Sequence, residues 1–133
     1  MERFEYAQDL ADVEELLEQS WEHERQQVQT ELQQLDEQLE ARKGIHDQTV
    51  DELETELDAS IERLELLYKR SQGKHGERAQ LKSRIESLSE ALRVERRTHW
   101  RDCQDLLTER REFRRELRAL ESDLSAALFE AVR

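Results

Sequence analysis

The sequence predicts an all-α fold, a long antiparallel two-helix coiled-coil hairpin, and three observations support this prediction. The 133 residues include no proline and only three glycines, and 41% of them are charged while 35% are hydrophobic. This composition is typical of long helices and provides too little apolar material for a thick globular core. Apolar residues recur every seven positions, and one short glycine-containing segment interrupts the pattern. We therefore expect a single elongated domain over residues 1–133, with a first helix at 1–70, a turn at 71–77 and a second helix at 78–132.

The second helix carries the clearest heptad pattern. One row of seam residues repeats every seven positions and comprises Ile85, Leu92, His99, Leu106, Phe113, Leu120 and Ala127. The other row shifts phase once, and comprises Leu88, Glu95, Cys103, Arg110, Leu117, Leu124 and Ala131. Alternating steps of three and four residues, sustained over about seven heptads, indicate the seam of a coiled coil.

The first helix contains two heptad stretches separated by Gly44. The first consists of Leu17, Trp21, Val28, Leu32, Leu35 and Leu39, and the second of Val50, Leu53, Leu57, Ile61, Leu64 and Tyr68. The step from Leu39 to Val50 is one that continuous helix accommodates. However, the segment 49–52 has the form of a capping box. We expect a continuous or slightly bent helix, and the alternative is a break near 43–48 that would produce a three-helix bundle.

The segment 71–76 contains Gly73 and Gly76 and indicates a helix end followed by a turn. If the chain folds back there, facing residues should have numbers with a nearly constant sum. A sum near 149 pairs Leu64 with Ile85 and Leu57 with Leu92, and brings the two seams into register. The two glycines argue against the remaining alternative, a straight chain in a parallel homo-oligomeric coiled coil.

The charge is negative overall and unevenly distributed. The net charge is −12, and residues 1–72 hold 7 Lys and Arg against 21 Asp and Glu, whereas residues 73–133 hold 14 against 12. Nucleic acid and anionic lipid would be repelled by the first half. No apolar run is long enough to span a membrane. The single cysteine and the absence of asparagine, hence of N-glycosylation sites, fit a cytoplasmic or other reducing compartment.

The ends of the hairpin are the predicted partner-binding surface. With a sum of 149, residues 1–16 extend past the C-terminus and their apolar side chains have no partner, which is typical of a protein contact. Trp100 is expected beside the seam and partly exposed, as interface tryptophans often are. The candidate partner-binding residues are Phe4, Tyr6, Leu10, Val13, Trp100, Leu128 and Phe129.

No catalytic, cofactor-binding or metal-binding residues are predicted. The same register places His46 near Cys103, but a zinc site needs four ligands and no CxxC or HxxxH pair is present. Polar residues in a seam more often set the register of a coiled coil. The arginines of 93–118 are expected to form a salt-bridged face, and Arg110 to pair with a first-helix carboxylate such as Glu37 or Glu40.

These observations predict a non-enzymatic structural or adaptor protein that acts by protein–protein contact, with other proteins or itself as partners, as a spacer, tether or subunit of an assembly. In length and in its single turn the expected hairpin resembles the stalk proteins of flagellar and type III export. That resemblance is one of architecture, and it implies a helical stalk coupled to an ATPase or secretion apparatus as an alternative function. A homodimerising coiled-coil rod is the other alternative.

Overall fold

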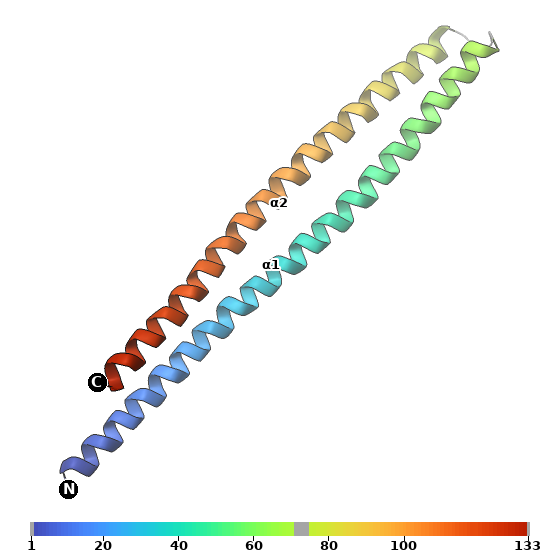
Figure 1. Cartoon of the computed structure of the whole chain (residues 1–133). Helices are drawn as coiled ribbons and strands as arrows, with labels where there is room; N and C mark the ends of the chain where they lie inside the picture. The colour runs from blue at the N-terminus through green and yellow to red at the C-terminus, as the bar shows by residue number, and fades with distance from the viewer. Residues whose placement is uncertain (1, 71–74, 133) are drawn as a thin grey trace. The chain divides into compact units, whose positions relative to one another are not determined.

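The computed structural model describes the backbone of residues 2–70 and 75–132 and the side chains of residues 8–70 and 76–130. It contains two α-helices, α1 at Glu2–Lys69 and α2 at His75–Val132. The two helices (Figure 1) divide into two compact units. Unit 1 joins Met1–Gln38 to Leu106–Arg133, and unit 2 is Leu39–Asp105. In each unit a segment of α1 packs against an oppositely directed segment of α2, which confirms the all-α helical hairpin.

Helix α1 passes through Gly44 without a break, so the three-helix alternative is wrong. A Cβ atom built on Gly44 meets nothing within 4 Å, and no close packing therefore requires glycine here. The step from Leu39 to Val50 is filled by Arg42 and His46, both of which lie partly buried at seam positions. The apparent gap in the pattern is thus a polar part of a continuous seam.

The helix boundaries differ slightly from the predicted ones. Helix α1 ends at Lys69, and the Arg70 N–H donates to the Leu66 carbonyl at 3.0 Å. Helix α2 begins at His75, three residues before the predicted start, so Gly76 belongs to the helix. Gly73 lies outside the described residues.

The core is a narrow seam rather than a layer. Its most buried apolar residues are Val28 and Leu35 in unit 1, and Leu67, Leu88 and Leu92 in unit 2. Over the residues that the structure describes, no helix is long and apolar enough to cross a membrane.

Three seam positions in α1 were assigned wrongly from the sequence, and the first of them, Leu17, is 42% exposed. Ile61 is 38% exposed and Tyr68 is 48% exposed, whereas Ser60 and Leu67 are buried. The steps from Leu53 continue strictly as 4, 3, 4 and 3 residues, which places the small Ser60 inside and the larger Ile61 on the flank. Tyr68 instead lies under two cations, with the Arg78 guanidinium 5.0 Å and the Lys82 ammonium 5.5 Å from its ring centroid.

The predicted pairing register was also wrong, by about one helical turn. In unit 2 the rings of His46 and His99 stack, which gives a sum of 145 rather than 149. In unit 1 the ion pair between Arg110 and Asp36 gives a sum of 146. Registers one turn apart still set seam residues of α1 against seam residues of α2, so heptad matching alone does not separate them. Polar contacts across the seam distinguish the register that forms.

Candidate functional site

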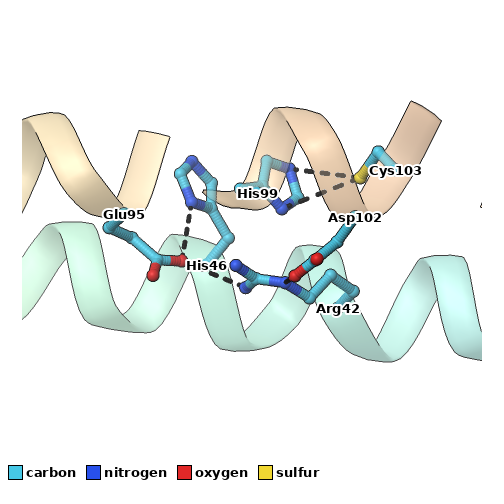
Figure 2. A network of polar contacts seen from close by, with 6 residues as sticks. All are labelled: Arg42, His46, Glu95, His99, Asp102 and Cys103. Carbon is cyan, nitrogen blue, oxygen red and sulfur yellow. Dashed lines mark hydrogen bonds and ion pairs between the residues drawn. The ribbon is translucent and has the colours of Figure 1, made fainter. Parts of the chain in front are cut away.

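A layer of polar residues occupies the seam of unit 2. The layer is anchored by Arg42, which donates from Nη1 to Glu95 Oε1 at 3.0 Å and from Nε to Asp102 Oδ2 at 2.9 Å. The Arg42 and Glu95 side chains are only 16% and 19% exposed. One cation from α1 thus joins two carboxylates on α2 in a partly desolvated position. Figure 2 shows this polar layer, which comprises Arg42, His46, Glu95, His99, Asp102 and Cys103.

Two histidines complete the polar layer. His46 Nδ1 lies 3.1 Å from Glu95 Oε1, the oxygen that also accepts from Arg42. The rings of His46 and His99 stack with centroids 3.8 Å apart and an interplanar angle of 7°. Cys103 Sγ lies 3.6 Å from His99 Nε2, one turn along α2. Glu95, rather than Cys103, is therefore the polar partner of His46.

Burial and charge pairing within the polar layer shift the pKa values of His99, Glu95 and Arg42. Burial lowers the pKa of His99, and the positive charges of His46 and Arg42 lower it further. Burial alone would raise the pKa of Glu95, but the hydrogen bonds from Arg42 and His46 outweigh it, and the pKa falls below its usual value. The hydrogen bonds to Asp102 and Glu95 raise the pKa of Arg42. The layer is therefore built around a charged Arg42–Glu95 pair and a neutral His99.

The polar layer does not resemble a metal site. Within the part of the chain that the structure describes, no three His, Cys, Asp or Glu side chains are placed to hold a metal ion. The two imidazole rings lie parallel and stacked on each other, so their nitrogens do not converge on one point as the ligands of a tetrahedral metal ion would. The arrangement serves packing and charge pairing across the seam.

The second feature is the open end, which we define as residues 8–24 of α1 and 119–130 of α2, both in unit 1. Trp21 lies near the inner limit of the open end, and its Nε1 donates to the Leu120 carbonyl at 2.8 Å. That oxygen has a second lone pair beyond the one used in the helix, so it accepts the indole without breaking α2. Arg25 lies 5.5 Å from the Trp21 ring centroid and donates to Glu22 at 2.9 Å. The hydrogen bond from Trp21 to Leu120 joins the two helices where the open end begins, and the contacts of Arg25 lie within α1.

Beyond Trp21, large apolar side chains of α1 are exposed. Leu10 and Leu17 are a little under half exposed, Val13 slightly more than half, and Leu16 66%. With Arg110 paired to Asp36, Val132 lies level with about residue 14, so the extension of α1 past α2 is slightly shorter than the predicted 1–16 (Figure 1). These four apolar side chains are exposed because they lie on a flank of α1 outside the seam.

The remaining predicted partner-binding residues are dispersed. Trp100 is 67% exposed, but it lies in unit 2 and is not part of the open end. In α2, Leu128 is half-buried and Phe129 is exposed. The side chains of Phe4 and Tyr6 lie outside the described residues.

Sequence reasoning found only part of the polar layer. It identified His46, His99 and Cys103 but paired them in the wrong register, and it did not place Arg42 or Asp102 in the layer. Arg42 could have been found, because it lies seven residues after Leu35 and four before His46, at a regular seam position. Arg110, predicted to pair with Glu37 or Glu40, instead approaches Asp36, with its Nε 2.8 Å from Oδ1. That N–H does not point at the carboxylate oxygen, so the contact is an ion pair without a hydrogen bond.

The fold and these surfaces define the class of protein, an all-α helical hairpin with a coiled-coil seam. No curated protein matches the chain, and no solved structure matches it. A family model described as a family of unknown function, DUF8104, matches residues 1–129. The chain therefore belongs to the DUF8104 family.

Proposed function

We propose that this chain is a non-enzymatic structural or adaptor protein that acts by protein–protein contact, as a spacer, tether or subunit of a larger assembly in a reducing compartment such as the cytoplasm. The observation that carries the proposal is the exposure of Leu10, Val13, Leu16 and Leu17 along one flank of α1 at the open end. Contiguous exposed apolar residues with polar surroundings are typical of interaction surfaces.

The rest of the described surface supports the same proposal. The hollow beside His23 and Phe113 is open to solvent, and enzymes need pockets that exclude water. In both units the heptad seam is already occupied by the chain's own second helix, so a parallel dimer built on that seam would have to displace it. New contacts would therefore be made by residues outside the seam. A stalk coupled to an ATPase stays a prediction from architecture.

Site-specific photo-cross-linking in cells that express the protein tests the proposal. A photoreactive phenylalanine analogue at Leu16 should give a discrete adduct with a partner protein. The matched control is the same analogue at Ile45, which is 59% exposed but lies in unit 2. If both positions give no adduct, or the same diffuse set of adducts, the open end is not a docking surface and the proposal fails.

A further inference from the structure

The exposed apolar residues of the open end form a stripe along α1. Leu10, Val13 and Leu17 follow one another at helical spacings of three and four residues, with Leu16 beside them. Residues three and four apart share a helix face, so these side chains present one surface. An amphipathic helix is the natural occupant of such a stripe, because its own apolar residues repeat at the same spacing.

The charge around this stripe is one-sided. Residues 8–24 contain seven Asp and Glu and no Lys or Arg, and residues 119–130 contain three Asp and Glu and no Lys or Arg. Asp9, Asp12, Glu14 and Glu18 lie within one turn of the stripe. Arg25, the first described cation along α1, is already hydrogen-bonded to Glu22. Apart from Glu22 and Glu121, which interact with Arg25, the carboxylates of the open end have no Lys or Arg beside them within the two segments.

This imbalance discriminates among occupants. An isologous contact between two open ends would set these carboxylates against an identical set, and like charges brought together oppose association. Nucleic acid and anionic membranes would be repelled for the same reason. A helix with Lys and Arg beside its apolar residues would instead bury the stripe and neutralise the carboxylates together.

We propose that the open end binds an amphipathic helix of another protein, with apolar residues at i, i+3 and i+7 flanked by Lys and Arg. This inference rests on the proposed function and names the chemistry of its partner. Leu10, Val13, Leu16 and Leu17 supply the apolar contact, and the acidic residues on either side select a basic partner and accelerate its association.

A fluorescent synthetic peptide tests the proposal with the full chain. The probe is a basic amphipathic helix of about 20 residues with leucine at the stated spacing. One control peptide has the same composition in scrambled order, and the other has Glu in place of each Lys and Arg. In anisotropy titrations the probe should bind at least about tenfold more tightly than either control, and its affinity should fall as salt rises.

Paired substitutions locate the binding site. Val13→Ser with Leu16→Ser should weaken probe binding at least about tenfold, because both remove apolar contact at exposed positions that folding does not need. The matched control, Ile45→Ser, should bind as the unmodified chain does. Circular dichroism of each variant verifies that the helices persist.

Several outcomes would overturn the proposal. Equal binding of the scrambled peptide would mean that charge alone attracts it, and unchanged binding to the Val13/Leu16 variant would place the contact elsewhere. A concentration-dependent dimer that this variant abolishes would identify a second copy of the chain as the occupant. A cross-link from position 16 to a protein, combined with failure of the basic peptide, would refute the partner chemistry and leave the proposed contact function standing.

Discussion

The polar layer makes a quantitative prediction about Arg42. Replacing Arg42 with methionine keeps most of the aliphatic stem and removes the guanidinium, which leaves Glu95 partly buried with only His46 as a partner. Hydrogen bonds to charged groups contribute about 1.5–3 kcal/mol, and a charge that loses its partner costs more as its burial increases. Glu95 is 19% exposed in a seam only two helices wide, so solvent still reaches it. We expect Arg42→Met to lower the free energy of unfolding by about 1.5–3 kcal/mol.

The same chain offers a matched control. Arg84 donates to Glu56 at 3.4 Å across the same two helices, but these side chains are 59% and 54% exposed. Exposed ion pairs contribute about 0–1 kcal/mol, so Arg84→Met should change the free energy of unfolding by less than about 1 kcal/mol. Urea unfolding followed by circular dichroism at the helix band measures both variants. With a urea dependence of about 2 kcal/mol per molar, the Arg42 variant should unfold at about 1 M less urea.

A third variant separates the cause. Adding Glu95→Leu to Arg42→Met removes the stranded carboxylate and places an apolar residue in the seam, so most of the lost stability should return. If Arg42→Met and Arg84→Met shift the urea midpoint equally, the polar layer is as well solvated as the surface and the argument is wrong. If the double variant is no more stable than Arg42→Met, the loss does not arise from an unpaired Glu95.

Three further predictions concern pH, glycine and the seam. His99 takes up a proton less readily folded than unfolded, so stability in urea should begin to fall as pH drops below about 6.5, its ordinary pKa. The depressed pKa of Glu95 adds a second loss below about 4.5, and His99→Gln should remove the first loss alone; an unchanged profile would contradict the assignment. Gly44→Ala should raise the free energy of unfolding by about 0.5–1 kcal/mol, since a Cβ meets nothing there, and a loss measured by urea unfolding would mean that glycine is needed. Leu67→Ala should cost about 2–3 kcal/mol and Ile61→Ala less than half of that, and equal costs in the same assay would refute the observed seam.

The sequence was informative where a single period governs the structure. Seam residues of α2 from Ile85 to Ala127 were predicted correctly, because each position that faces the other helix must carry a residue that can be buried. The same pattern made the pairing register ambiguous, since sliding one helix by about one turn again sets seam residues against seam residues. Ser60 was overlooked for a related reason. Hydrophobicity favours the larger Ile61 as the seam residue. The regular twist of the helix pair instead places residue 60 in the seam, where a small side chain can be buried.

The polar layer provides the information that the apolar repeat lacks. In the predicted register, with a sum of 149, Glu95 would face the carboxylate of Glu54 and lie about one turn farther from Arg42 and His46. In the observed register Glu95 instead accepts from Arg42 and lies beside His46. A shift of about one turn therefore changes little in the apolar burial but replaces the attractive contacts of Glu95 by a like-charge one. We expect the layer to act mainly on the choice of register, because pairing largely offsets the cost of desolvating its charges. For a protein proposed to act by contact, the register within unit 1 matters in its own right. There it fixes which residues of α2 lie beside Leu10 to Leu17, and so determines the surface that a partner meets.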